Sequence, residues 1–146
     1  METVYTIGFA KRTAAQFFGA LGQAGVKRVL DVRLSNSSQL AGFTKRADLP
    51  FFLREICGAE YMHEPLLAPT KGLVDDFKKK KGNWDDYERG FRRLMIERQV
   101  QHKLNPTFFS VPTALLCSET TAEHCHRRLV LEYLLSKWGD FPIVHL

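Results

Sequence analysis

The chain has 146 residues, of which 45% are hydrophobic and 25% charged, a balance that excludes disordered and fibrous proteins and predicts one globular domain over residues 1–146. Lysine and arginine outnumber aspartate and glutamate by 21 to 16, and the net charge of +5 favours an anionic partner such as a nucleic acid or a phosphorylated small molecule. No apolar run reaches the ~18 residues of a membrane span and the N-terminus lacks a secretory signal, so we expect a cytoplasmic protein with no membrane partner.

The residue pattern from 4 to 33 predicts two parallel strands joined by a helix. A strand at 4–9 is followed by Thr13 and, three residues later, Gln16, a spacing typical of a capping box at a helix start. Gly25 provides a stop, and a second strand at 28–33 completes a strand–helix–strand unit.

Strands and helices continue to alternate in the rest of the chain. Helices are predicted at 47–57, 70–80, 84–103 and 121–138, and strands at 60–64, 112–117 and 142–145. This alternation indicates an α/β domain with about five mostly parallel strands and helices between them. Right-handed crossovers favour a central first strand, flanked by the second and the fourth.

Ligands of open parallel sheets bind beyond the carboxyl ends of the strands, and the densest group of reactive residues lies at such an end. It follows the fourth strand and opens the next helix: Cys117, Glu119, Cys125, His126 and Arg127. Thr120 and Glu123 form a second capping-box pattern, which predicts a helix start just before Cys125.

This group has three interpretations. Helix amides, the helix dipole and Arg127 favour a bound phosphate or carboxylate and lower the pKa of a nearby thiol. The side chains are also potential zinc ligands, although the spacing Cys-x7-Cys-His matches no common structural zinc pattern. Each cysteine by itself is typical of a buried packing residue. We interpret the group as functional and expect a lower thiol pKa for Cys125 than for Cys57, which follows an apolar run.

A second group lies at the carboxyl end of the second strand. Asp31 and Arg33 are two residues apart and therefore share one face of the strand. Asp31 is a candidate acid/base with Arg33 holding it ionised, and the alternative is a structural ion pair.

Other candidate binding residues are scattered. Phe43 and Lys45 belong to a basic loop with an aromatic residue, which is typical of nucleic-acid contacts but also of a solvated loop. His63, close to Tyr61, is a candidate general base or a polar core histidine, and Lys78–Lys81 form a charge run. The single glycine after the first strand is no dinucleotide fingerprint, and no cofactor is predicted.

Several motifs together resemble the domain of unknown function 488 family, over a region from Tyr5 to Leu146. They are Thr6-Ile7-Gly8-Phe9, Asp31-Val32-Arg33, Ser38-Gln39-Leu40-Ala41-Gly42-Phe43, Tyr61-x-His63, Leu67-Ala68-Pro69-Thr70, Leu116-Cys117-Ser118-Glu119 and Cys125-His126-Arg127-Arg128. The resemblance implies a Rossmann-like α/β domain with its motifs at one end of the sheet, and no established reaction. The chain departs from the commoner family opening, which carries His and Ser where Phe9 and Ala10 stand here.

The leading hypothesis is an enzyme that acts on a phosphorylated or nucleic-acid-type substrate. Arg33 and Arg127 would hold the anion, Asp31 or Glu119 would serve as acid/base, and Cys117 or Cys125 as nucleophile or redox thiol. The alternatives are a non-enzymatic nucleic-acid-binding module and a metal-dependent enzyme with Cys117, Cys125 and His126 as ligands. The hypothesis predicts that Arg33, Cys117, Glu119, Cys125 and Arg127 surround one cleft.

Overall fold

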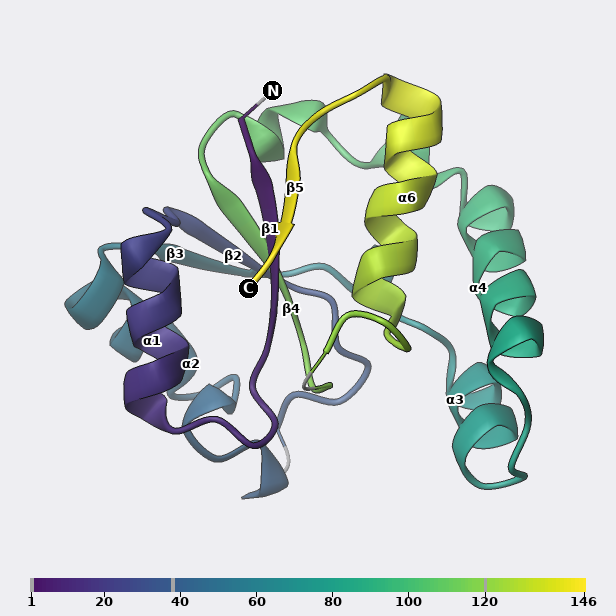
Figure 1. Cartoon of the computed structure of the whole chain (residues 1–146), viewed down its shortest axis with the longest axis horizontal. Helices are drawn as coiled ribbons and strands as arrows, with labels where there is room; N and C mark the ends of the chain where they lie inside the picture. The colour runs from purple at the N-terminus through teal and green to yellow at the C-terminus, as the bar shows by residue number, and fades with distance from the viewer. Residues whose placement is uncertain (1, 38, 120) are drawn as a thin grey trace.

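Five parallel strands form the sheet at the centre of the molecule (Figure 1). The structure is a computed structural model that describes residues 2–37, 39–119 and 121–146, except for the side chains of residues 39 and 40. The strands are β1 (Val4–Gly8), β2 (Arg28–Asp31), β3 (Glu60–His63), β4 (Thr113–Cys117) and β5 (Ile143–His145). All their pairings are parallel, which confirms the predicted α/β class.

The strand order is β3-β2-β4-β1-β5, so the prediction that the first strand lies between the second and the fourth is wrong. β4 occupies the centre, and all five of its residues are buried. Its sequence, Thr-Ala-Leu-Leu-Cys, suits a strand that is covered on both faces. β1 instead pairs with β4 on one side and with the partly exposed β5 on the other. β1 and β2 are parallel, as predicted, with β4 between them.

Helices cover both faces of the sheet (Figure 1). One face packs against α1 (Ala14–Gln23), α2 (Leu49–Phe52) and the π-helical turn that continues it (Leu53–Cys57). The other face packs against residues of α3 (Lys71–Lys78), α4 (Trp84–Arg98), α5 (Val100–Lys103) and α6 (His126–Trp138). Short 3-10 turns occupy Gln39–Thr44, Pro65–Leu67 and Pro106–Phe109. In the described part of the chain, no helix combines the length and the apolar character that a membrane crossing needs.

Alternation along β4 decides which side chains meet which layer of helices. Ala114 and Leu116 belong to the core under α1, whereas Leu115 and Cys117 belong to the core under α4 and α6. This follows from the opposite directions of successive side chains on a strand. Cys117, the last residue of β4, is therefore directed toward the layer of α4 and α6.

Helix boundaries agree with the sequence pattern at some ends and differ at others. The capping box before α1 is confirmed: the Thr13 hydroxyl accepts from the Gln16 amide, and the Gln16 side chain accepts from the Thr13 amide. The helix predicted at 84–103 is broken at Gln99, whose φ of 53° is left-handed, into α4 and α5. A residue with left-handed backbone angles ends a helix because it turns the chain away from the helical path.

The last helix begins later than predicted. α6 starts at His126, not near residue 121, and the extended residue Cys125 (φ −139°, ψ 141°) is its N-cap, without a side-chain capping bond. The predicted capping box rests on Thr120, which lies outside the described residues. Cys125 therefore precedes the helix, whereas the sequence pattern placed it in the first turns.

Candidate active site

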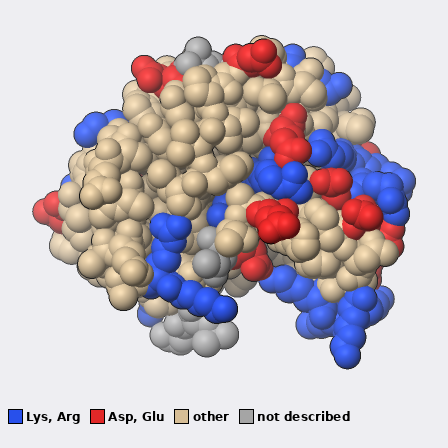
Figure 2. Space-filling view, viewed as in Figure 1, with Lys and Arg blue, Asp and Glu red and all other residues tan. Residues whose placement is uncertain are grey.

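A cleft of about 230 Å³ opens beyond the carboxyl ends of β2 and β4, on the face covered by α3, α4 and α6. Figure 2 shows the surface hollowed at its lower edge, beside a group of lysine and arginine side chains at the lower right, where α3 lies in Figure 1. We call it the thiol cleft, and it is lined by Arg33, Leu34, Ser35, Pro69, Val74, Phe77, Lys78, Trp84, Tyr87, Cys117, Ser118, Glu119, His124, Cys125 and His126.

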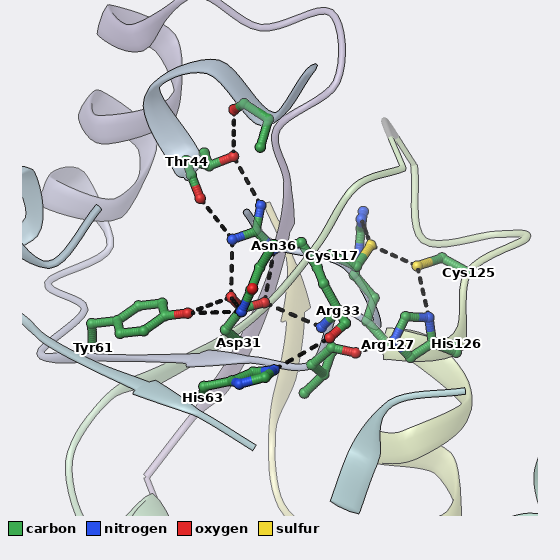
Figure 3. Close-up of polar contacts among 12 residues, drawn as sticks. Asp31, Arg33, Asn36, Thr44, Tyr61, His63, Cys117, Cys125, His126 and Arg127 are labelled. Carbon is green, nitrogen blue, oxygen red and sulfur yellow. Dashed lines mark hydrogen bonds and ion pairs between the residues drawn. The ribbon is translucent and has the colours of Figure 1, made fainter. Parts of the chain in front are cut away.

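Two cysteines meet at the buried end of this cleft (Figure 3). The Sγ atoms of Cys117 and Cys125 are 2.6 Å apart, and the two residues are 1% and 2% exposed. Cys117 is held by the centre of the sheet, and Cys125 reaches it from the turn that precedes α6. Residues eight positions apart in the chain therefore form one thiol pair.

The buried guanidinium of Arg127 contacts the Cys117 sulfur of this pair. Arg127 is fully buried; its Nη1 donates to Cys117 Sγ and to the carbonyl oxygen of Glu119, both at 2.8 Å. Its Nε donates to the hydroxyl of Thr6 at 3.2 Å. Of the carboxylates in the described residues, none forms an ion pair with Arg127; the carboxylate of Glu119, for example, pairs with Lys78. A buried cation requires a compensating negative charge, and Cys117 supplies one when it is deprotonated.

The two thiols have opposite pKa shifts. Burial alone would raise the pKa of Cys117, but the hydrogen bond from Cys125 and the charge and hydrogen bond of Arg127 outweigh it and lower that pKa. Burial and the hydrogen bond to Cys117 raise the pKa of Cys125. The expectation that the pKa of Cys125 is lower than that of Cys57 is wrong, because the Cys125 side chain is buried against Cys117. Burial also raises the pKa of Cys57.

His126 is a neutral neighbour of the pair. Its Nε2 lies 2.6 Å from the carbonyl oxygen of Val32, so this nitrogen carries the proton, and its Nδ1 lies 4.0 Å from Cys125 Sγ. Burial lowers the pKa of His126 to about 4; the hydrogen bond to Val32 opposes this shift and the charge of Arg127 adds to it. The ring positions the start of α6 against the end of β2, and it does not add a positive charge beside the thiols at neutral pH.

Gly8 makes room for the loop that carries Glu119. A Cβ atom at this position would lie 1.5 Å from the Glu119 carbonyl oxygen and 2.6 Å from Arg127 Nη1. The loop after β4 therefore crosses directly over the end of β1, in register with Cys117. Only glycine permits this approach.

Asp31 and Arg33 form a buried network beside the cleft (Figure 3). Arg33 Nε and Nη2 donate to the two carboxylate oxygens of Asp31 at 2.8 and 2.9 Å. Further contacts of the network are donated by Arg33 to the hydroxyl and carbonyl of Thr44, and by Tyr61 and Asn36 to Asp31. Burial would raise the pKa of Asp31, but Arg33 and Tyr61 lower it overall.

This geometry supports the structural alternative for the pair. Asp31 is fully buried and is not among the residues that line the thiol cleft. Arg33 borders the cleft, but its guanidinium donates to Asp31 and Thr44, so it is committed to the network. Arg127 does not line the cleft, and its guanidinium donates to Thr6, Cys117 and Glu119. The two predicted anion-binding arginines are thus occupied within the protein.

The other four predicted binding residues lie outside the lining of the cleft. The Tyr61 hydroxyl donates to Asp31 at 2.6 Å, and His63 Nε2 lies 3.4 Å from the carbonyl oxygen of Arg33. The Phe43 ring packs against Phe17 and Phe18 under α1, with centroids 5.4 and 5.7 Å away. Lys45 Nζ lies 4.0 Å from the carboxylate of Asp48.

Comparison with known proteins places these motifs in a family. The sequence model of the family described as "Domain of unknown function DUF488" matches residues 13–134. The chain belongs to this family. The resemblance drawn from the motifs is thereby confirmed, and the match includes the thiol pair and Arg127. No curated protein and no solved structure matches the chain.

A stack of three rings in the DUF488 region borders the thiol cleft and was not predicted as part of the site. Trp84 stacks on Tyr87 at 5.0 Å and on His124 at 4.9 Å, with interplanar angles of 22° and 21°. The sequence places Tyr87 on the apolar stripe of α4, but this position is equally typical of a core residue and does not indicate a site. His124 adjoins the Cys-His-Arg motif, but nothing in the sequence aligns it with a helix that lies forty residues earlier.

The predicted metal-dependent alternative gains no geometric support. Within the described residues, no three or more His, Cys, Asp or Glu side chains converge as a metal-binding group. His126 directs its protonated nitrogen at Val32, and Cys117 directs its sulfur at Arg127.

Proposed function

We propose that this protein is an enzyme that uses the thiolate of Cys117 as a nucleophile on a phosphorylated small molecule bound in the thiol cleft. The observation that carries the proposal is the contact of Cys117 Sγ with the fully buried guanidinium of Arg127, at 2.8 Å. A thiolate, not a thiol, is the reactive form of cysteine, and a neighbouring cation stabilises it. Cys117 borders the cleft, so a small reagent can reach it.

The lining of the cleft indicates how such a substrate would be held. Val74, Phe77, Trp84 and Tyr87 provide apolar and aromatic surface for the uncharged part of the molecule. Lys78 borders the same cleft, and its side chain is 58% exposed. Arg33 and Arg127 are buried and committed within the protein. Lys78 pairs with Glu119 at 2.8 Å, but this ion pair is exposed, and Lys78 is the cation that we assign to the phosphate.

The reaction that fits these groups is phosphoryl transfer through cysteine. The Cys117 thiolate attacks phosphorus; an S–P bond forms and the bond from phosphorus to the leaving oxygen breaks. Water then attacks the phosphocysteine, which releases phosphate and restores the thiolate. Glu119 borders the cleft and is the carboxylate that we assign to proton exchange with the leaving group and the water.

Hydrolysis of p-nitrophenyl phosphate by the full chain, followed by absorbance, tests this proposal. We expect turnover by the wild type and a loss of more than about 100-fold in Cys117→Ser, as is usual when a nucleophile is removed. Cys57→Ser is the matched control, because Cys57 packs under α1 on the opposite face of the sheet and should leave the rate unchanged. Equal rates for Cys117→Ser and the wild type, or no turnover of this ester and of nucleoside monophosphates, would contradict the proposal.

A second candidate is a nucleic-acid-binding module, favoured by the exposed Lys78–Lys81 run (Figure 2). Neighbouring carboxylates weaken it, since Lys79 and Lys80 pair with Asp75 and Asp76 at 3.6 and 3.2 Å. The half-buried Phe43 ring packs against Phe17 and Phe18, which weakens the aromatic contact expected beside Lys45. An oligonucleotide affinity that falls steeply with salt, with a shallower slope in Lys79→Ala/Lys80→Ala, would support this candidate, and a flat salt response would exclude it.

A further inference from the structure

We infer that Cys117 and Cys125 form a reversible intramolecular disulfide in which Cys117 is the oxidised thiol and Cys125 the resolving thiol. The two Sγ atoms are 2.6 Å apart in the reduced pair, so bond formation at ~2.05 Å requires an approach of only about 0.5 Å. Both residues border the thiol cleft, which gives a small oxidant a route to them.

The surroundings of the pair assign the two roles. Arg127 Nη1 donates to Cys117 Sγ at 2.8 Å and stabilises its thiolate. Cys125 Sγ, 2.6 Å away, is the proton donor when Cys117 is deprotonated, because a thiolate can only accept. A thiolate reacts with peroxide and a neutral thiol does not, so oxidation begins at Cys117.

The backbone around the two residues also differs. Cys117 ends the central strand, where β1 pairs with it through Gly8. Cys125 is an extended residue ahead of the first turn of α6, outside the hydrogen bonds of the helix interior. Cys125 is thus the residue that can move by the small distance that the bond requires, while Cys117 stays in place.

The chemistry requires a peroxide as the oxidant. The Cys117 thiolate attacks one oxygen of hydrogen peroxide; an S–O bond forms, the O–O bond breaks, and the released hydroxide takes a proton to become water. Cys125 then attacks the sulfenic sulfur; the S–S bond forms, the S–O bond breaks, and the hydroxyl leaves with the Cys125 proton as a second water. Two thiols lose two electrons, one peroxide is reduced to two waters, and an external dithiol reverses the step.

Disulfide formation does not depend on the proposed function, but its consequence does. With Cys117 bonded to Cys125, the nucleophile assigned above is blocked, and phosphate-ester turnover should stop until the disulfide is reduced. The bond also protects Cys117 from irreversible oxidation to the sulfinic and sulfonic acids. The disulfide therefore protects the Cys117 sulfur reversibly from overoxidation.

Peroxide treatment of the full chain, followed by denaturation, alkylation with iodoacetamide and mass spectrometry, tests this inference. Trypsin releases residues 104–127 as one peptide that holds both Cys117 and Cys125, while Cys57 falls on another. We expect the wild type to lose both alkylation sites of this peptide, keep Cys57 alkylated, and regain all sites after dithiothreitol. Cys57→Ser, the control, should give the same result.

Removal of the resolving thiol gives the complementary result. In Cys125→Ser, we expect peroxide to carry Cys117 on to the sulfinic acid, which dithiothreitol does not reverse. Persistent alkylation of both cysteines in the treated wild type would overturn the inference, whatever the folding of the variant. Oxidation of the wild type to the sulfinic acid without loss of both alkylation sites would also overturn it. A disulfide in a protein that hydrolyses no phosphate ester would contradict the proposed function alone.

Discussion

The charge of Arg127 is balanced differently from that of the other buried arginine. Arg33 shares a bidentate contact with the carboxylate of Asp31, which is ionised at every pH near neutrality. Arg127 instead contacts a thiol, a hydroxyl and a carbonyl. Its counter-charge thus exists only while Cys117 is deprotonated, which couples the ionisation of the cleft sulfur to the stability of the buried cation.

Replacement of Arg127 by methionine should raise the pKa of Cys117. The aliphatic part of the side chain is kept and the cation is removed, so nothing offsets the burial of the thiolate. Titration of thiolate absorbance near 240 nm should show a group with a pKa below the ordinary 9.0 in the wild type and its loss in the variant. Cys117→Ser should lack this group as well, and its persistence there would assign the titration to another cysteine.

Asp31→Asn should destabilise the protein strongly without acting on the cleft directly. The change leaves the Arg33 guanidinium buried without a full negative charge, which typically costs about 3–5 kcal/mol. Urea unfolding measures the loss, and Asp48→Asn is the control, because its exposed contact with Lys45 at 4.0 Å should contribute less than about 1 kcal/mol. Equal stabilities of the two variants would contradict the structural role of the Asp31 network.

Residue patterns predicted the place of the reactive group better than the roles of its members. Cys117 was expected at a strand end, and strand alternation directs it to the cleft. The roles of Arg33 and Arg127 were missed because a long side chain can extend to solvent or fold inward, and only the packing around it decides which. The pKa of Cys125 was misassigned for a related reason, since the helix begins only after Cys125 and the thiol is turned toward Cys117.

At the scale of elements, the cleft depends on two chain segments that cross closely. The loop after β4 passes over Gly8 at the end of β1, and this crossing holds the Glu119 carbonyl where Arg127 reaches it. The strand order produces the crossing, because β1 and β4 are direct neighbours whose ends are in register. This order was not predicted, because local patterns identify strands but do not show which strands are adjacent. β4, the fourth strand along the sequence, lies between β1 and β2.

Gly8→Ala should therefore destabilise the protein and disturb Cys117 at the same time. The added methyl group would lie 1.5 Å from a backbone oxygen, so the loop must move, with an expected loss of about 1–3 kcal/mol. Gly22→Ala in α1 is the matched control; its Cβ would meet nothing within 4 Å, and helix propensity predicts a gain of about 0.5–1 kcal/mol. Thermal unfolding distinguishes the two, and a Gly8→Ala variant as stable as the wild type would exclude the close crossing.

At the scale of the whole molecule, two separate cores lie on the two faces of the sheet. The core under α1 contains Phe17 and Phe18, whereas the core under α4 and α6 contains the thiol pair. The predicted α/β class and the helices on both faces are confirmed. They could be predicted because the pattern of apolar residues within each element is a local property of the sequence. The assignment of reactive residues to one core follows from strand register, which depends on the complete sheet.

The stability of the molecule should fall in mild acid because of His126. Its pKa is about 4 in the folded chain and near 6.5 when unfolded, so the unfolded state binds more protons between these values. The contribution of the neutral ring is fully present above pH 6.5 and is lost as pH falls toward 4, by at most about 3 kcal/mol. Urea unfolding at several pH values measures this slope, and His126→Gln, which keeps a donor for Val32, should reduce it; an unchanged slope would assign the acid sensitivity elsewhere.

The stacked indole of Trp84 gives the molecule an intrinsic optical probe. The chain has two tryptophans, and the second, Trp138, packs against Phe109 and donates its Nε1 proton to the Gln101 carbonyl, outside the lining of the cleft. A Trp138→Phe variant would leave Trp84 as the single emitter, in contact with His124 and at the wall of the cleft. Its fluorescence should then change when a ligand displaces solvent from that wall, and a disulfide formed at the cleft's buried end should quench it. Occupancy and redox state would thus be followed in real time, in an unlabelled protein.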